Sequence, residues 1–209
     1  HGVYRSVYNF CVVDLSNFYF DIIKDRLYCA DVAARRSAQT ALYKILDGMT
    51  RMMAPILAFT SEEIWAAMPH DKSADPGSVL FNEMPEYDEA LVLSEAEAAR
   101  WAALAAARED VNKLMEGARS AKPIGKSLEA AVTVGGEHAK ALANEQEGFL
   151  AEIFIVSQVK LDASADGISV AAAPGEKCER CWTVSEHVGE DAEHATLCPR
   201  CAHVVKTEN

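Results

Sequence analysis

The sequence lacks a long hydrophobic run. No stretch among its 209 residues approaches the roughly 18 continuous apolar residues of a membrane-spanning helix. The first residues also lack the basic and then apolar pattern of an export signal. These two absences predict a soluble cytoplasmic protein with no membrane partner.

Basic residues are scarce. The chain has 20 Lys and Arg against 32 Asp and Glu, which gives a formal net charge of −12. This balance excludes a protein whose whole surface is a cationic coat for nucleic acid, although it leaves room for local basic patches. The acidic residues concentrate between residues 70 and 117, whereas residues 1–69 are neutral overall.

Signatures of catalysis are missing as well. The sequence contains no nucleophile elbow, no HExxH zinc-protease motif and no dinucleotide-binding glycine pattern. Gly125-Lys126-Ser127 resembles the end of a phosphate loop, but Ser120 stands where the first glycine is needed and an extended segment follows. We therefore predict no catalytic residue. Because His1 is not a methionine and a helical pattern starts at Val3, we also expect the chain to be a fragment.

Helical periodicity dominates the first half. Apolar residues recur at helical spacing over residues 3–28, where one or two helices fit, and over residues 38–53, where Pro55 ends the pattern. Residues 70–88 read as a long connection with a short extended piece at 79–81.

Two capping boxes mark further helix starts. Thr60 and Glu63 precede a short helix that Pro69 ends. Ser94 and Glu97 open a helix of about 25 residues. The fold class predicted from these patterns is mainly α, with an antiparallel helical bundle.

The period changes after residue 120. Extended segments are expected at 128–134, 153–161 and 168–172, with a polar helix at 137–146, which together form a small α+β unit. From residue 176 onward the chain has almost no apolar run and needs another means of stabilisation. The predicted domains are 1–120, 121–175 and 176–209.

Four cysteines near the C-terminus supply that means. Cys178 and Cys181, and then Cys198 and Cys201, form two CxxC pairs that 16 residues separate. This spacing is typical of a zinc ribbon, and four thiolates leave no open position, so the predicted Zn²⁺ is structural. Disulfides and a rubredoxin-like iron site are the alternatives. The other two cysteines lie in helical segments and are expected to be buried apolar residues.

The zinc module also carries groups suited to RNA. Trp182 follows a predicted ligand directly, and Arg180 and Arg200 lie inside the two CxxC turns. An aromatic ring can stack on an unpaired base, and guanidinium groups can pair with phosphates. The alternative is that Trp182 lies flat on a neighbouring domain.

Five segments carry a family resemblance, and they cover nearly the whole chain. They are DLSNFYFDIIKDRLY (14–28), ARRSAQTALYKIL (34–46), MAPILAFTSEEIW (53–65), SLEAAV (127–132) and KCERCW…LCPRC (177–201). In this order they resemble the C-terminal part of bacterial isoleucyl-tRNA synthetases. The resemblance implies a helical anticodon-binding domain, a junction domain and a zinc module that helps to hold the anticodon loop.

The resemblance also implies roles for particular residues and partners. The zinc ligands would be the four cysteines, with Arg180 and Trp182 as the first candidates for tRNA contact and Arg200 beside them. Arg35 and Arg36 match the paired arginines of the family. The partner would be an isoleucine tRNA, and the chain would be a monomer. The HIGH-like and KMSKS-like motifs of the family's catalytic domain, which uses ATP, are absent from this sequence. We therefore expect this chain to bind tRNA without aminoacylating it.

Two other functions stay open. A DNA glycosylase of the formamidopyrimidine type also ends in a zinc finger with two CxxC pairs, and it acts on a flipped base. A purely structural module, in which the zinc ribbon only docks on the rest of the protein, is the second alternative.

Overall fold

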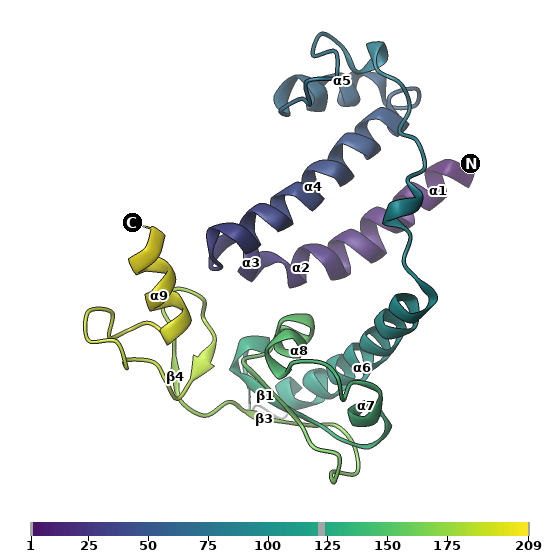
Figure 1. The fold of residues 1–209 in the computed structure, drawn as a ribbon. Coiled ribbons are helices and arrows are strands. Elements are labelled where there is room, and N and C mark those ends of the chain that lie inside the picture. The colour runs from purple at the N-terminus through teal and green to yellow at the C-terminus, as the bar shows by residue number, and fades with distance from the viewer. Residues whose placement is uncertain (1, 121–123, 209) are drawn as a thin grey trace. The chain divides into compact units, whose positions relative to one another are not determined.

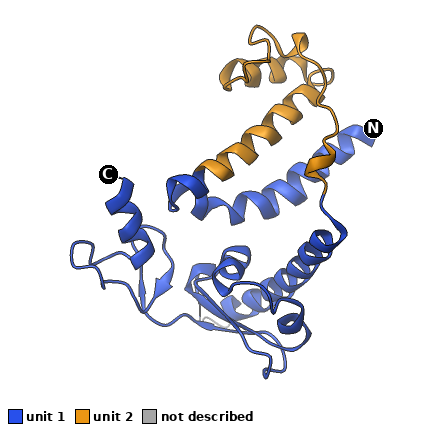
Figure 2. Ribbon diagram, in the orientation of Figure 1, with its two compact units in different colours: residues 1–35, 93–209 blue, residues 36–92 orange. Residues whose placement is uncertain are grey.

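The computed structural model describes residues 2–120 and 124–208 (Figure 1). Most of these residues are helical, which confirms the mainly α prediction. No helix in the described part of the chain is long and apolar enough to cross a membrane. The chain divides into two compact units, one of residues 1–35 with 93–209 and one of residues 36–92 (Figure 2).

The first unit begins with a helical segment of mixed winding. Helix α1 (Gly2–Asn9) leads into a π-helix, η1 (Phe10–Tyr19), and the short helices α2 (Phe20–Ile22) and α3 (Lys24–Tyr28) follow. Where η1 ends, the N–H of Phe20 donates to the carbonyl of Leu15, one residue further back than in an α-helix. The segment predicted as one or two helices is thus helical almost throughout, and its last helix reaches the metal module described below.

Helix α6 (Glu95–Ser120) is the central helix of the hydrophobic core in the first unit. It begins at the predicted capping box: the N–H of Glu97 donates to Ser94 Oγ at 3.2 Å, and Glu97 Oε2 accepts the Ser94 N–H at 3.0 Å. Its inner face packs on β3 and on helices α7 and α8. The residues of that face are almost fully buried: Leu104, Ala107, Val111 and Met115.

A three-stranded sheet covers this helix. The strands β1 (Ala130–Val134), β2 (Gln158–Leu161) and β3 (Ser169–Ala172) lie in the order β2-β1-β3. Strand β1 is parallel to β2 and antiparallel to β3. The parallel pair requires a crossover, and α7 (Gly136–Ala141) and α8 (Glu147–Phe154) provide it.

The structure of the crossover differs from two predictions. The polar helix expected at 137–146 ends at Ala141, and residues 153–154, predicted as strand, close helix α8. Leu150, Ile153 and Phe154 are each at most 2% exposed, so their helical spacing places them on the core. Ile155 then ends α8 in the left-handed conformation, with φ 56°. The strand of this segment therefore begins only at Gln158.

The metal module ends the first unit. It consists of a two-stranded ribbon, β4 (Glu176–Lys177) and β5 (Val184–Ser185), and of helix α9 (Pro199–Glu208). The ribbon strands pair antiparallel, with Lys177 opposite Val184. This arrangement brings both CxxC turns to one place.

The second unit has a small core of its own. It contains residues 36–53 of α4 (Val32–Met53), α5 (Ala58–Ala67), and the 3₁₀ turns η2 (Val79–Phe81) and η3 (Glu89–Leu91). The buried residues of this core are Ala54, Trp65, Met68 and Val79.

Two local predictions in this unit are wrong. Helix α5 begins at Ala58, before Thr60, and the N–H of Ser61 donates to Leu57 O as the first bond of the helix. The N-cap residue is therefore Leu57, whose side chain has no hydrogen-bond acceptor, and the helix start has no side-chain cap. Residues 79–81 form a 3₁₀ turn and not an extended piece. The Val79 side chain, 2% exposed, belongs to the core around Trp65.

Candidate metal centre and its surroundings

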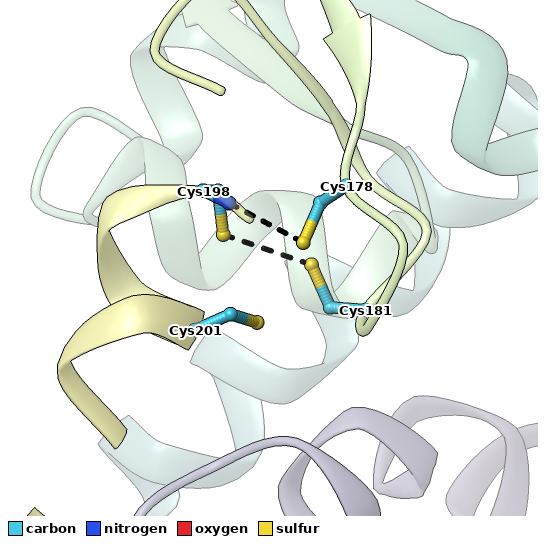
Figure 3. A group of neighbouring side chains, drawn as sticks. All are labelled: Cys178, Cys181, Cys198 and Cys201. Atoms are coloured by element: carbon cyan, nitrogen blue, oxygen red, sulfur yellow. Dashed lines mark hydrogen bonds between the residues drawn. The ribbon is translucent and has the colours of Figure 1, made fainter. Parts of the chain in front are cut away.

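The four predicted cysteines converge in the metal module (Figure 3). Cys178 and Cys181 lie in the turn between β4 and β5, and Cys198 and Cys201 lie at the start of α9. Their Sγ atoms all lie within 4.8 Å of one another, and the four residues are buried. The Sγ atoms of Cys181 and Cys198 are 3.8 Å apart.

This geometry fits a tetrahedral zinc ion. Four thiolates at a Zn–S distance of about 2.3 Å have their sulfurs about 3.8 Å apart. The 3.8 Å between the sulfurs of Cys181 and Cys198 is much longer than a disulfide bond of about 2 Å, so the arrangement favours metal ligands over the disulfide alternative. The N–H of Cys198 lies 3.4 Å from the Cys178 sulfur, the kind of donor that orients a metal-bound thiolate. Four sulfurs complete the coordination sphere of Zn²⁺, so the ion is structural.

The backbone of the first CxxC turn is fixed by its own hydrogen bonds. The N–H of Trp182 donates to Cys178 O at 2.9 Å, and the N–H of Cys178 donates to Thr183 O at 2.9 Å. This turn holds Trp182 in the left-handed conformation, with φ 66°. A side chain other than glycine is strained there, by roughly 1–2 kcal/mol. The ring is 58% exposed, so burial does not explain why a tryptophan occupies this position.

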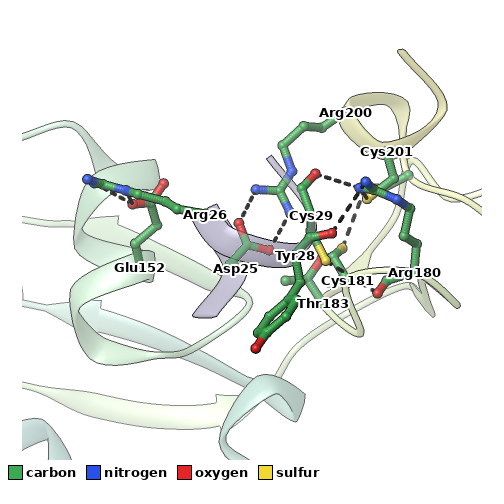
Figure 4. A network of polar contacts seen from close by, with 11 residues as sticks. Asp25, Arg26, Tyr28, Cys29, Glu152, Arg180, Cys181, Thr183, Arg200 and Cys201 are labelled. Carbon is green, nitrogen blue, oxygen red and sulfur yellow. Dashed lines mark hydrogen bonds and ion pairs between the residues drawn. The ribbon is translucent and has the colours of Figure 1, made fainter. Parts of the chain in front are cut away.

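Arg180 attaches the same turn to helix α3 (Figure 4). Its Nη1 donates to Cys29 O and lies 3.7 Å from Cys201 Sγ, and its Nη2 lies 3.4 Å from Tyr28 O. The Cys29 thiol faces the Arg180 carbonyl at 3.5 Å. Burial, and then the Asp25 carboxylate, raises the pKa of the Cys29 thiol. Cys29 is thus a neutral residue of the interface, which agrees with its prediction as a buried apolar residue.

Arg200 forms a second attachment. Its guanidinium makes a two-point ion pair with Asp25, in which Nη2 lies 2.7 Å from Oδ1 (Figure 4). Arg35 pairs with Glu208 at the end of α9. Three of the predicted RNA-contacting arginines therefore already bind groups of this chain.

The other two predicted contact residues are more accessible. Trp182 is exposed, as described above. Arg36 belongs to the second unit, where it is exposed and donates to Gln39 Oε1 on its own helix at 3.2 Å. The structure therefore brings Arg180, Trp182 and Arg200 together at one module of the first unit.

A cleft of about 1000 Å³ opens beside Trp182, between α2, α3, α8 and the metal module. Tyr28, 75% exposed, lines it together with Phe149 and Trp182, so three aromatic rings border the space. Arg180 and Arg200 line it as well, and so does Glu152, which pairs with Arg26 at 2.8 Å. Such a cleft can accept flat, partly polar groups as large as nucleotides.

Sequence reasoning missed the groups that accept hydrogen bonds from Arg180 and Arg200. Asp25, Tyr28 and Cys29 lie about 150 positions or more from Arg180 and Arg200 along the chain. Nothing in their local sequence marks them as acceptors. Only the folded chain identifies α3 as the docking site of the metal module.

The ion pair between Asp25 and Arg200 should contribute measurably to folding. Its two-point geometry favours a coupling free energy of about 1 kcal/mol in a double-mutant cycle of Asp25→Asn and Arg200→Gln. Urea unfolding of the zinc-loaded chain measures it. The exposed pair of Lys113 and Asp110 on α6 is the control, with an expected coupling of about 0.3 kcal/mol. Equal coupling in both cycles would mean that Arg200 does not hold the module.

Comparisons with known proteins agree on one family. Residues 1–134 match the family model of the anticodon-binding domain of tRNA ligase, and residues 175–204 match that of the zinc finger found in FPG and IleRS. The isoleucine–tRNA ligase of Geobacter sulfurreducens is 45% identical over 222 residues, which cover 99% of this chain and 23% of that protein. The isoleucine–tRNA ligase of Desulforamulus reducens is 47% identical over 225 residues, which cover 99% of this chain and 24% of that protein.

A third relative agrees with these two. The isoleucine–tRNA ligase of Bacillus mycoides is 44% identical over 220 residues, which cover 98% of this chain and 24% of that protein. The chain thus spans about a quarter of the length of these relatives. Since the first family model covers residues 1–134, more than half of the sequence, the chain belongs to the anticodon-binding domain family of tRNA ligases.

Proposed function

We propose that this chain recognises the anticodon stem-loop of an isoleucine tRNA. The match of residues 1–134 to an anticodon-binding domain carries the proposal, and the names of the relatives support isoleucine as the amino acid. The exposed Trp182 at the mouth of a wide cleft supplies a surface on which an unpaired base can stack.

The proposed division of labour follows three domains. Residues 1–120 would supply the helices that hold the anticodon stem-loop, residues 121–175 the junction, whose sheet packs on helix α6 of the first domain, and residues 176–209 the zinc module with its four cysteine ligands. The boundary after residue 120 adjoins residues 121–123, which lie outside the described residues. The chain would work as a cytoplasmic monomer, and ATP-dependent aminoacylation would belong to the catalytic domain of a longer ligase.

Trp182 and the arginines would have different roles. Trp182 would stack on a base, while Arg36 would meet phosphates from its exposed position on α4. Arg35, Arg180 and Arg200 would contact RNA from the interface that they also hold together. The zinc-bound turn fixes the backbone of Trp182 before RNA binds. Less conformational entropy is therefore lost when a base stacks on the ring.

Fluorescence anisotropy with a labelled isoleucine tRNA transcript tests the proposal. We expect the zinc-loaded chain to bind the transcript more tightly than the same transcript with altered anticodon bases, over a range of salt concentrations. Equal affinity for both transcripts would contradict anticodon recognition by this chain.

Replacing Trp182 with glycine sharpens the test. Glycine adopts the left-handed conformation without strain, so Trp182→Gly should keep the turn, the zinc content and the stability of the module. The loss of one base stack should weaken tRNA binding by about 1–3 kcal/mol, or roughly 5- to 150-fold. Arg180→Ala should weaken binding as well, without loss of zinc. Wild-type affinity in both variants would rule out these contacts.

The zinc-bearing glycosylase is the weaker alternative. Its support comes from the cysteine motif alone, whereas the anticodon-binding match lies outside that motif. A base-release assay on damaged duplex DNA separates the two functions. A purely structural role predicts instead that the folded, zinc-loaded chain has no affinity for tRNA.

A further inference from the structure

Two lysines flank the exposed Trp182 ring. The Nζ atom of Lys177 lies 5.4 Å from the ring centroid, and the Nζ atom of Lys126 lies 6.0 Å from it. Both ammonium groups are within the range of a cation–π interaction. Lys177 belongs to β4 of the metal module, and Lys126 lies in the loop before β1. The ring therefore lies where the metal module meets the part of the first unit that contains α6, α7, α8 and strands β1 to β3, which we call the sheet domain.

The backbone that carries each lysine is held in place. Glu129 Oε2 accepts the N–H of Gly125 at 2.8 Å and the N–H of Lys126 at 3.1 Å. These hydrogen bonds lower the pKa of Glu129, so its carboxylate is ionised and engaged by the loop. On the other side, Lys177 pairs with Val184 in the ribbon. The anchor points of both side chains are fixed.

Contacts between the two domains fix the anchor points relative to each other. The Ser157 hydroxyl donates to Leu128 O and accepts the N–H of Val184 at 2.7 Å. Gln158 Nε2 lies 3.1 Å from Pro174 O and 3.4 Å from Val184 O. Ser157 thus joins the segment next to Lys126 to the ribbon of Lys177, and Gln158 adds contacts from β2 to the ribbon and to the segment before it.

The two ammonium groups interact with the Trp182 ring and, without an ion pair, with the Glu129 carboxylate, whose pKa their charges lower after the two backbone hydrogen bonds. Both lysines are exposed, and neither forms an ion pair with any residue in 2–120 or 124–208, although five other lysines do. A lysine over an exposed aromatic ring keeps most of its hydration and its charge. Two positive charges beside a stacking surface are suited to the phosphate groups of an RNA backbone, each of which carries one negative charge.

We propose that Lys126 and Lys177 bind the phosphates on the two sides of the nucleotide whose base stacks on Trp182. The inference rests on the proposed function, since it names residues of the same RNA site that neither the sequence motif nor the family match assigns. A base that slides over the ring displaces the ammonium groups from it, and they turn to the backbone on either side. The three side chains then act as a clamp for one unpaired nucleotide.

The clamp has a distinct salt signature. Each phosphate contact to a single strand contributes about 0.7 to the slope of log affinity against log salt concentration. The double variant Lys126→Gln/Lys177→Gln should therefore lower the slope by about 1.4 and weaken binding on the order of tenfold at 0.1 M salt. The ratio of affinities for native and altered anticodons should stay the same, because phosphate contacts carry no sequence information.

Anisotropy titrations with the isoleucine tRNA transcript, in a salt series, measure both quantities. Lys140→Gln is the matched control, because Lys140 is an exposed lysine that pairs with Glu137 on α7, and its slope should equal that of the wild type. Lys126→Arg/Lys177→Arg should restore the slope, since the charge returns.

The outcomes separate the clamp from the proposed function. If the wild type binds the transcript and Trp182→Gly weakens binding, but the double lysine variant keeps the wild-type slope, the clamp is wrong and RNA recognition stands. If the wild type itself has no affinity for the transcript, the proposed function fails. A slope that falls in the glutamine variant and returns in the arginine variant establishes the clamp.

Discussion

Removal of zinc is expected to unfold residues 176–208 and to leave the sheet domain folded. The buried residues of the metal module are mostly its four cysteines, with Val184, Ala202 and Val204 as the main apolar additions. So little apolar area cannot stabilise a module of this size by itself. The binding free energy of a structural zinc ion, about 10–16 kcal/mol in small zinc peptides, is therefore the folding free energy of the module.

The core around α6 should survive because it does not include the module. Its buried residues come from α6, α8, the sheet and the segments that join them. Hydrogen exchange after treatment with a zinc chelator should show loss of protection over residues 176–208 and unchanged protection in β1 and α6. The variant Cys201→Ser should behave like the chelated wild type.

The half-buried Cys11 in η1 provides the matched control. Cys11→Ser removes a thiol outside the metal site, so the variant should bind one zinc ion per chain and keep the protection of α9. Full protection of the module in the metal-free chain would contradict a zinc-dependent fold. Cobalt can replace zinc in the same sulfur set and would report tetrahedral thiolate coordination by its absorption.

The metal centre could be predicted from sequence because its constraint is local. Each CxxC pair places two sulfurs on one tight turn, and the ion requires the two turns to meet. The Ser94 capping box was predictable for the same reason: both of its hydrogen bonds lie within one turn of helix.

The docking contacts of the module could not be predicted in this way. Their charge, their place in the CxxC turns and the family resemblance made Arg180 and Arg200 candidates for RNA contact, but their carbonyl and carboxylate partners come from α3 and its C-cap. A guanidinium accepts either kind of partner, and the sequence does not say which one the fold brings near. Likewise, Lys126 and Lys177 lie far apart in the chain and meet only at the Trp182 ring.

Tertiary packing also explains why some predictions of local structure were wrong. Residues 153–154 have the β-branched and aromatic character of a strand, yet helix α8 extends through them because their side chains fill the core under the sheet. The segment after Pro69 contains the turn residues of a loop, and it is a loop. Its Val79 is nevertheless buried against Trp65, which composition alone did not indicate.

Trp65→Ala is expected to unfold the small core of the second unit. Trp65 is 1% exposed, and its Nε1–H donates to Asp75 O at 3.1 Å. The Arg51 guanidinium lies 5.1 Å from the ring centroid. Truncation of a buried tryptophan costs about 3–5 kcal/mol, and the other three buried residues of this core, one of them an alanine, cannot replace the lost area.

The expected result is a local loss of structure, because Trp65 packs within the core of its own unit. Hydrogen exchange should become fast over residues 54–82 and stay slow in α6 and β1. Trp65→Phe is the matched variant: it keeps an aromatic ring but loses the hydrogen bond to Asp75, at a cost on the order of 1–2 kcal/mol, and residues 54–82 should remain protected. If Trp65→Ala kept wild-type protection over this segment, the helix α4 alone would suffice to order it, and the loop that carries Val79 would have no part in the stability of the unit.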